Sequence, residues 1–426
     1  MAAQSLVELE SLASKGDSQA MYQLGLLFLR QDNVQSAFNW LYKAHNLKHI
    51  RSTELLGVLV LQGHGVKPNP KLALEYFRSA AMYGDAQALM RCAEMMFSGK
   101  GVLQERSGAI GCVIESAKQG YPVALRTVGF FLLRQVGVPI DIALRAFRLA
   151  AYGGDPHSQF VMAKQASTAA EKNSWMRLAS QRGLYLAQHV NPGEPNTFDL
   201  SAVKGDLNSE LQTLIPYINV LRQLDKVVLP SSIVSEKAGI SVFENALSGI
   251  ETDYIINISA SMLSPAKVVS ANNTIKLEDV RTGMTASLGH VLDLTVDWLV
   301  ERISGLIGQS VKHAEVPSVI RYNPGQMYKQ HGDYLPEGSD LADRVKGGQR
   351  SHTALVYLND GYNGGATRFN LLDVVVQPKQ GQLLTFSNIT PQGQPLLESQ
   401  HTGEVVLNGE KWLLSIWFRQ FATENV

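Results

Sequence analysis

The first half of the chain repeats itself with a period in the mid-thirties. A glycine followed by a helix-like apolar segment recurs at Gly16, Gly84, Gly120 and Gly154, and the segment from Lys48 occupies the same phase without the glycine. The successive intervals are 32, 36, 36 and 34 residues. This period is typical of stacked helix pairs, because one pair cannot bury its apolar face without neighbours. We therefore expect the chain to begin with an all-α solenoid of five helix-pair units.

Residues 54–84 carry the signals that separate the two helices of one unit. The first helix is expected to end near "QGHGV", where glycine supplies a left-handed stop, and a proline-containing turn leads into the second. Small residues recur at one phase, where they let helices approach closely: Ala44, Ala80, Ser116, Ala150 and Ala179. The fragments "NWLYKAH" (39–45), "GKGV" (99–102) and "VGV" (136–138) resemble the Sel1-like subclass of tetratricopeptide repeats.

The resemblance to Sel1-like repeats covers about residues 3–187, and the first domain is expected at 1–187. It implies a concave surface that holds peptides or partner proteins. The alternative interpretation is that the array is only a spacer or an assembly platform.

Composition narrows the class of protein. Lys+Arg and Asp+Glu number 38 each, so no nucleic-acid partner is expected. The two cysteines, Cys92 and Cys112, are interpreted as buried thiols in a reducing compartment. The N-terminus does not have the pattern of a secretory signal, and no apolar run has the length of a membrane span. We expect a cytoplasmic protein without a membrane partner.

The periodicity stops after the repeats. Residues 189–210 contain two prolines and two glycines among polar residues and predict a linker. A helix near 210–224 would bridge the two halves, and the linker and this helix together are expected at 188–235. An amphipathic helix is expected at 288–308, and short strand-like runs with turn residues follow it. A helix followed by seven or eight strands favours an α+β domain built on a β-sandwich or barrel, at residues 236–426.

Three residues of the second domain have the chemistry of a metal site. His331 and Asp333 are two apart, so on a strand their side chains would share one face. Such a pair can hold a metal or form a surface hydrogen bond. His401 supplies a second imidazole, and two histidines with one carboxylate form the facial triad that holds non-haem Fe(II). Lys411 begins the apolar run "KWLLSIWF" and needs an anionic partner there.

The second domain is similar to the prolyl 4-hydroxylase branch of the 2-oxoglutarate/Fe(II) oxygenases. The resemblance covers about residues 238–421 and rests on "RYNPGQMYKQHGDY", "HTALVYLND", "GGATRF", "GQLLTFSN" and "SQHTGEVVLNGEKWLLSIWFR". It implies a double-stranded β-helix core of the jelly-roll type, with 2-oxoglutarate and O2 as cosubstrates and ascorbate as a reductant. The implied Fe(II) ligands are His331, Asp333 and His401, and the implied 2-oxoglutarate contacts are Lys411, Tyr322, Tyr357 and Ser415.

The resemblance also implies a reaction. The enzyme would hydroxylate a prolyl residue of a protein or peptide, with oxidative decarboxylation of 2-oxoglutarate to succinate and CO2, and the repeats would recruit the substrate. One alternative is an oxygenase of a free amino acid or other small molecule, with the repeats used for assembly. Another is a non-catalytic protein-binding adaptor. Ala366 in "GGATRF" departs from the glutamate that this branch often has, which leaves the substrate environment open.

Overall fold

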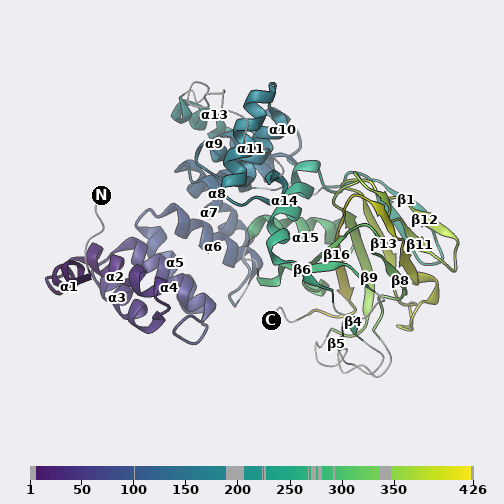
Figure 1. The fold of residues 1–426 in the computed structure, drawn as a ribbon, viewed down its shortest axis with the longest axis horizontal. Coiled ribbons are helices and arrows are strands. Elements are labelled where there is room, and N and C mark those ends of the chain that lie inside the picture. Colours follow the sequence, from purple (N-terminus) through teal and green to yellow (C-terminus); the bar gives the residue numbers. More distant parts are fainter. Residues whose placement is uncertain are drawn as a thin grey trace. The chain divides into compact units, whose positions relative to one another are not determined.

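The computed structural model divides the chain into two compact units (Figure 1). The repeat unit comprises residues 1–162 and 199–224, and the sheet unit comprises 163–198 and 225–426. The structure describes residues 6–99, 101–188, 206–222, 224, 227–266, 268–269, 275–276, 281–290, 293–335 and 347–423. The predicted order of a helical repeat region followed by a β-rich domain is confirmed.

The repeat unit is built from antiparallel helix pairs. After α1 (Leu6–Ser14) come the pairs α2 (Ser18–Arg30) and α3 (Val34–Asn46), α4 (Ile50–Gln62) and α5 (Pro70–Met82), α6 (Ala86–Ser98) and α7 (Arg106–Lys118), and α8 (Pro122–Leu132) and α9 (Ile140–Tyr152). Two further helices, α10 (Pro156–Gln165) and α11 (Ala169–Gln181), follow in the sequence, and the boundary between the units falls within α10. Each expected repeat start therefore directly precedes a helix, as the period predicts.

The predicted stop signals and small residues have the expected roles. Gly63 and Gly99 end α4 and α6 in the left-handed conformation, with φ of 75° and 69°. The small residues of the repeat phase are fully buried: Ala44, Ala80, Ser116, Ala150 and Ala179. Gly57 shows why small residues are needed, because a Cβ there would lie 2.5 Å from the Phe77 ring. Helix approach thus depends on these positions.

The segment between the two halves is arranged differently from the expected linker. The helix expected near 210–224 is α13 (Leu207–Val220), which packs on α7, α8 and α9 within the repeat unit through Leu214 and Ile218. Much of the expected linker, residues 189–205, lies outside the described residues. The boundaries 1–187, 188–235 and 236–426 stay a prediction, while contact density groups residues 163–198 with the sheet unit.

Residues 163–187 join the sheet unit through polar and aromatic contacts. Lys164 Nζ lies 2.6 Å from the Asp253 carboxylate. In the 3-10 helix η1 (Tyr185–Ala187), the Tyr185 hydroxyl donates to the Glu410 carboxylate at 3.0 Å, and its ring meets Trp412 edge-on at 5.4 Å. The last repeat-like segment is therefore held by the β domain.

Two sheets form the β domain (Figure 1). The large sheet has the order β1 (Ser231–Ser235), β2 (Ile240–Phe243), β13 (Leu383–Ser387), β9 (Arg350–Tyr357), β16 (Lys411–Arg419), β7 (Ser318–Tyr322), β6 (Met284–Ser287) and β3 (Ser264–Pro265). The small sheet has the order β12 (Val374–Val376), β11 (Thr367–Phe369), β14 (His401–Gly403) and β8 (Tyr328–His331). Two short pairs are β10 (Asn363–Gly364) with β15 (Val406–Asn408), and β4 (Val268–Val269) with β5 (Ile275–Lys276).

The core between the sheets is apolar and draws on both of them. Buried Ile320, Leu355 and Leu413 come from the large sheet, and Phe369 and Val376 come from the small one. Neighbouring strands pair antiparallel throughout, so alternate residues of each strand enter this core. The two packed sheets form the predicted jelly-roll core.

Two helices accompany the large sheet. These are α14 (Gly249–Ser259) and α15 (Leu294–Leu306), the latter shorter than the predicted 288–308 because the 3-10 helix η3 (Leu288–His290) occupies its expected first turn. Ser248 and Glu251 form a capping box at the start of α14. Glu251 is fully buried, and its carboxylate lies 2.6 Å from the Arg302 guanidinium of α15. No helix in the described part of the chain combines the length and apolarity needed to cross a membrane.

The buried pair predicts a stability effect. Arg302→Leu leaves the Glu251 carboxylate buried without its guanidinium, and the free energy of unfolding of the sheet unit should fall by roughly 3–5 kcal/mol. Urea unfolding followed by tryptophan fluorescence measures this. The control is Lys379→Leu, which removes the exposed ion pair with Glu244 and should cost about 1 kcal/mol or less. Equal losses in the two variants would contradict a structural role for the buried pair.

Candidate metal centre and cosubstrate pocket

Strand pairing brings the two predicted histidine ligands together. His331 is the last residue of β8, and His401 is the first residue of β14 and its direct partner in the antiparallel ladder. Their ring centroids are 4.3 Å apart. Tyr328 stacks on His331, with 3.4 Å between centroids, and Phe386 meets His401 edge-on. Both imidazoles are therefore held by packing.

Backbone carbonyls determine the tautomer of each imidazole. His331 Nδ1 lies 2.8 Å from the Lys329 carbonyl, and His401 Nδ1 lies 3.0 Å from the Ser399 carbonyl. A carbonyl oxygen only accepts hydrogen bonds, so each Nδ1 must carry the proton. In the neutral form of each ring the lone pair of Nε2 is then free, which is the state that binds a metal.

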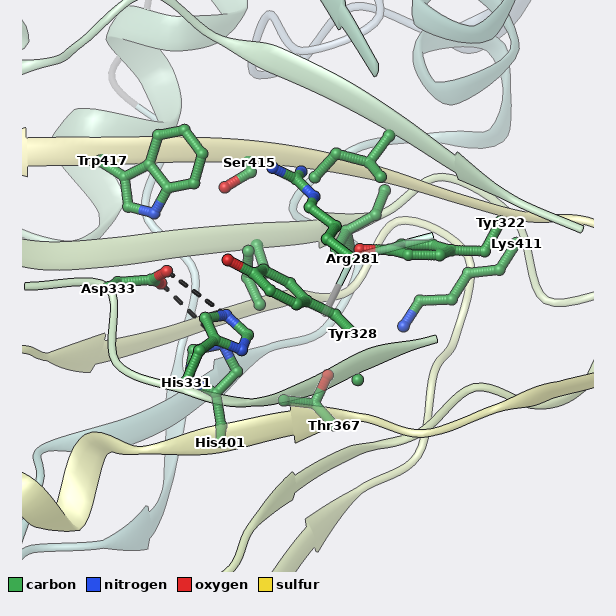
Figure 2. A pocket seen from close by; sticks show the side chains of 14 residues that line it. Arg281, Tyr322, Tyr328, His331, Asp333, Thr367, His401, Lys411, Ser415 and Trp417 are labelled. Atoms are coloured by element: carbon green, nitrogen blue, oxygen red, sulfur yellow. Dashed lines mark ion pairs between the residues drawn. The ribbon is translucent and has the colours of Figure 1, made fainter. Parts of the chain in front are cut away.

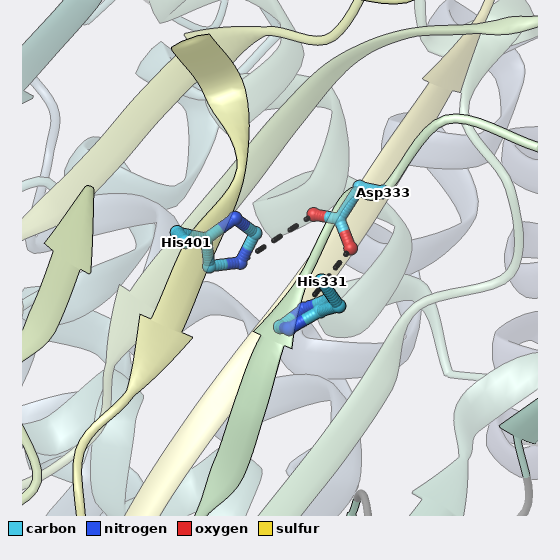
Figure 3. Close-up of side chains that lie close together, drawn as sticks. All are labelled: His331, Asp333 and His401. Carbon is cyan, nitrogen blue, oxygen red and sulfur yellow. Dashed lines mark ion pairs between the residues drawn. The ribbon is translucent and has the colours of Figure 1, made fainter. Parts of the chain in front are cut away.

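Asp333 completes the cluster from just beyond the strand. Its carboxylate lies 3.6 Å from His331 Nε2 and 3.9 Å from His401 Nε2 (Figure 3). The shared-face prediction for His331 and Asp333 gives the right convergence, although Asp333 follows the end of β8. Gly332 permits the bend, because a Cβ there would lie 2.4 Å from the Tyr334 ring. One ligand atom from each of the three side chains lies within 4.8 Å of the others.

Burial and neighbouring groups keep His331 and Asp333 in metal-binding protonation states. Burial, with a smaller contribution from the neighbouring His401, lowers the pKa of His331 to about 3, so His331 is neutral. Burial on its own raises the pKa of Asp333. The neighbouring imidazoles, Arg350 and a hydrogen bond from Thr353 outweigh this effect and hold the pKa below its usual range. The cluster therefore offers two imidazole nitrogens and one carboxylate.

Lys411 lies in the same pocket as the three residues (Figure 2). Its side chain is 2% exposed, and Nζ donates a hydrogen bond to the Gly365 carbonyl at 2.7 Å. No carboxylate among the described residues forms an ion pair with it. Burial lowers the pKa of Lys411 to about 8. A buried ammonium without a counter-ion is suited to an anionic ligand.

The pocket has the size and charge of a small-molecule site. Its volume is about 400 Å³, including the part that opens to solvent. Successive inward positions of β16 line it, namely Lys411, Leu413, Ser415 and Trp417, as strand alternation requires. The lining carries two cations, Lys411 and Arg281, and one carboxylate, so it has room and charge for an acidic ligand.

Comparisons with known proteins place the chain in a family. Residues 317–419 match the model of the 2OG-Fe(II) oxygenase superfamily, and residues 18–49, 52–85 and 86–121 match the Sel1 repeat. Prolyl 4-hydroxylase 1 of Arabidopsis thaliana is 32% identical over 207 residues, which cover 45% of this chain and 72% of that relative. The chain belongs to the 2OG-Fe(II) oxygenases of prolyl hydroxylase type. It is a 2-oxoglutarate dioxygenase that carries Sel1 repeats.

Other known proteins are similar to one part of the chain, either to its oxygenase domain or to its repeats. Prolyl 4-hydroxylase subunit alpha-3 of Homo sapiens is 28% identical over 187 residues, which cover 43% of this chain and 34% of that relative. The viral collagen prolyl hydroxylase from Paramecium Bursaria Chlorella virus-1 superposes with a TM-score of 0.34 at 24% identity, covering 42% of this chain and 95% of the viral chain. A Sel1 repeat protein from Oxalobacter formigenes superposes with a TM-score of 0.37 at 19% identity, covering 51% of this chain and all of that one.

The residues present fit the groups that the family uses. Two imidazole nitrogens and one carboxylate are the donor set of a facial Fe(II) site with open positions, and hard and borderline donors of this kind suit Fe(II). The Lys411 ammonium, which has no protein counter-ion among the described residues, fits a carboxylate of 2-oxoglutarate. The family assignment favours an enzyme over the non-catalytic adaptor.

The other predicted cosubstrate contacts lie at different depths. Tyr322 and Ser415 line the pocket with Lys411. Tyr357 lies behind the lining, where its hydroxyl is 2.7 Å from the Thr367 hydroxyl, and Thr367 itself faces the pocket. The roles of all seven predicted site residues stay predictions.

Sequence reasoning missed several lining residues. Trp417 could have been found, because it continues the period of two from Lys411 along β16. Thr367 directly follows "GGA" in a quoted motif, but the motif does not indicate which residue faces inward. Arg281 approaches Tyr328 at 5.1 Å from a segment far from the motifs, and no local pattern relates it to the site.

The buried lysine predicts a pH-dependent stability. The pKa of Lys411 is about 8 in the folded protein against 10.5 for an exposed lysine, so between these values the unfolded chain binds more protons. In the absence of 2-oxoglutarate, the free energy of unfolding should therefore rise as the pH goes from 8 to 10.5. The contribution of Lys411 to this rise is on the order of 3 kcal/mol. Comparing urea unfolding of wild type and Lys411→Met across this range isolates the lysine. Parallel pH profiles would mean that Lys411 is not buried as a cation.

Proposed function

We propose that this dioxygenase binds Fe(II) through His331, Asp333 and His401 and hydroxylates prolyl residues of a protein or peptide substrate. The observation that carries the proposal is the convergence of these three side chains in the same pocket as the buried ammonium of Lys411. When bound, the iron with 2-oxoglutarate and O2 supplies the oxidising chemistry. The protein supplies ligands, orientation and a dry environment.

Lys411 is proposed to bind the distal carboxylate of 2-oxoglutarate. Its Nζ keeps hydrogen-bonding capacity beyond the bond to Gly365, because an ammonium carries three protons. The rings of Tyr322 and Tyr357 lie 5.7 and 5.5 Å from Nζ and keep water away from it. An ion pair in such a site is stronger than in water. Ser415 is placed on the same strand to contact the cosubstrate.

The proposed reaction is the oxidative decarboxylation of 2-oxoglutarate coupled to hydroxylation. One atom of O2 enters succinate and the other enters the hydroxyl group of the product, and CO2 leaves. The support for proline as the target is the similarity to relatives named prolyl 4-hydroxylases. We propose ascorbate as a reductant for the iron. Two cysteines without a disulfide support the proposal of a reducing, cytoplasmic location.

The Sel1 repeats are proposed to recruit the protein substrate. Stacked helix pairs expose a continuous surface, which repeat proteins of this class use for binding. A weak docking site joined to a weak active site raises the effective concentration of the target near the iron. The repeats would then increase efficiency on a whole protein and not on a short peptide.

The metal assignment predicts the effect of removing one ligand. His401→Ala should abolish succinate formation and weaken metal binding, because only two ligands remain. Titration with Fe(II) or Co(II) and a succinate assay measure both effects. The control is His352→Ala, a half-buried histidine whose Nδ1 contacts Ser351 and which lies outside the cluster. Full turnover by the His401 variant would exclude this site.

The Lys411 assignment predicts a specific kinetic change. Lys411→Ala should raise the 2-oxoglutarate concentration needed for half-maximal succinate formation, since a hydrogen bond to a charged group contributes roughly 1.5–3 kcal/mol, or about 10- to 150-fold. Lys411→Arg keeps the charge and should be milder, although its planar fork needs a different geometry. An unchanged 2-oxoglutarate requirement in the alanine variant would show that another residue binds the carboxylate.

Substrate identity is tested by mass spectrometry. Lysate proteins from cells that lack the enzyme are incubated with wild type or with His401→Ala, in the presence of 2-oxoglutarate and Fe(II). We expect a gain of one oxygen on proline only with wild type. An oxygenated free amino acid or small molecule, with no modified protein, would favour the alternative substrate class.

The recruitment proposal is tested with the same substrate in two forms. The KM of the full chain is measured on the intact substrate protein, prepared without the hydroxyl group, and on a short peptide that spans the same proline. Docking on the repeats predicts a lower KM for the intact protein. Equal KM values would mean that the repeats serve assembly or stability.

A further inference from the structure

Two buried polar side chains form hydrogen bonds that lead from the Asp333 carboxylate into the protein interior, and neither of them lines the pocket. Thr353 lies on β9, on the same face as Leu355, and Asn388 directly follows β13. Both side chains are fully buried. They form a chain of hydrogen bonds, from Asn388 Nδ2 to Thr353 Oγ1 at 2.8 Å and from Thr353 Oγ1 to Asp333 Oδ2 at 2.8 Å.

The direction of this chain is determined by the atoms available. A hydroxyl has one proton, and the Asp333 carboxylate can only accept, so the Thr353 proton goes to Oδ2. The Asn388 amide then donates to the threonine oxygen. Both backbone groups of Asn388 form hydrogen bonds: its N–H donates to the Ser351 carbonyl, and its carbonyl accepts from the Leu396 N–H. Its side chain is therefore anchored independently of the metal site.

The Asn388 amide has one unusual feature. Its side-chain oxygen is buried and has no hydrogen-bond partner among the described residues. Rotating the amide by 180° would point that oxygen at Thr353 and draw the threonine proton away from Asp333. The observed orientation leaves an acceptor unpaired and keeps the threonine proton on the carboxylate. A buried unpaired group of this kind calls for a functional explanation.

The two oxygens of Asp333 are consequently unequal. Oδ2 accepts the hydrogen bond from Thr353, whereas no hydrogen bond reaches Oδ1 from the described residues. Figure 3 shows one carboxylate oxygen toward each imidazole, with Oδ1 3.6 Å from His331 Nε2. A carboxylate can bind a metal through one oxygen or through both, and binding through both would occupy a position that the cosubstrate or O2 needs.

We propose that Thr353 and Asn388 are positioning residues that restrict Asp333 to binding the metal through Oδ1 alone. The proposal rests on the proposed function, because it takes Asp333 as a metal ligand. Thr353 engages Oδ2, and Asn388 fixes the direction in which Thr353 donates. The open positions of the iron site are thereby kept for 2-oxoglutarate and O2.

The test uses the full chain and Co(II) as the probe, with and without 2-oxoglutarate. Thr353→Val keeps the shape of the side chain and removes the hydroxyl. It should lower Co(II) affinity by about 10- to 100-fold, as for other residues that orient metal ligands. It should also change the ligand-field absorption of the Co(II) protein with 2-oxoglutarate. Thr353→Ser keeps the hydroxyl and should retain both the affinity and the spectrum.

Asn388 acts through Thr353, which gives a second and independent readout. Asn388→Leu should weaken Co(II) binding less than Thr353→Val does. The double variant should be no weaker than Thr353→Val alone, because the asparagine has no effect once the hydroxyl is gone. The matched control is Thr385→Val, a buried threonine on β13 whose hydroxyl has no partner among the described residues.

The outcomes separate this proposal from the proposed function. Wild-type affinity and spectrum in Thr353→Val, as in Thr385→Val, would overturn the positioning role alone. Wild-type Co(II) affinity in His401→Ala would overturn the metal site and this proposal with it. If circular dichroism shows that Thr353→Val does not fold, Asn388→Leu decides, and an unchanged spectrum and affinity in that variant would overturn the proposal.

Discussion

The packing of the small sheet onto the large sheet is the constraint on which the site depends. The two histidines and Asp333 come from β8, β14 and the turn after β8, whereas Lys411, Tyr322 and Ser415 come from β16 and β7 of the other sheet. Phe369, Leu355 and Leu413 fill the space between the sheets and set their separation. A close-packed interior transmits small changes, so core substitutions would alter the distance between the proposed metal ligands and the proposed cosubstrate contacts.

Within this frame the oxygenase holds charges whose partners arrive with the ligands. The Lys411 ammonium is buried with a carbonyl as its hydrogen-bond acceptor, and both imidazoles have Nδ1 engaged by a backbone carbonyl, so that Nε2 is left for a ligand. Such a site reduces the stability of the ligand-free protein and offers strong contacts to an anion and a cation together. By contrast, Arg302 and Glu251 neutralise each other within the same unit and leave nothing for a ligand.

The sequence predicted the features that follow from short-range rules. The repeat period gave the helix pairs, and an ammonium in an apolar strand indicated an anionic ligand. The spacing of His331 and Asp333 predicted their convergence, although a bend at Gly332 produces it and not strand alternation. Arg281, Thr353 and Asn388 could not be found in this way, because their relation to the site arises from sheet pairing between distant segments. For the same reason, the sequence did not predict that residues 163–187 group with the β domain, since their local pattern is that of a repeat.

The position of Tyr185 has a consequence for how this protein could have been assembled by gene fusion. Alternation along β16 turns Lys411 toward the pocket and Trp412 toward Tyr185 on the opposite face of the same strand. A recombination event at the apparent end of the repeats, near residue 187, would separate the β domain from the tyrosine that covers Trp412. An exchange upstream of residue 163 would preserve this contact. The number of upstream repeats can therefore change without loss of this contact, provided that residues 163–187 stay joined to the β domain.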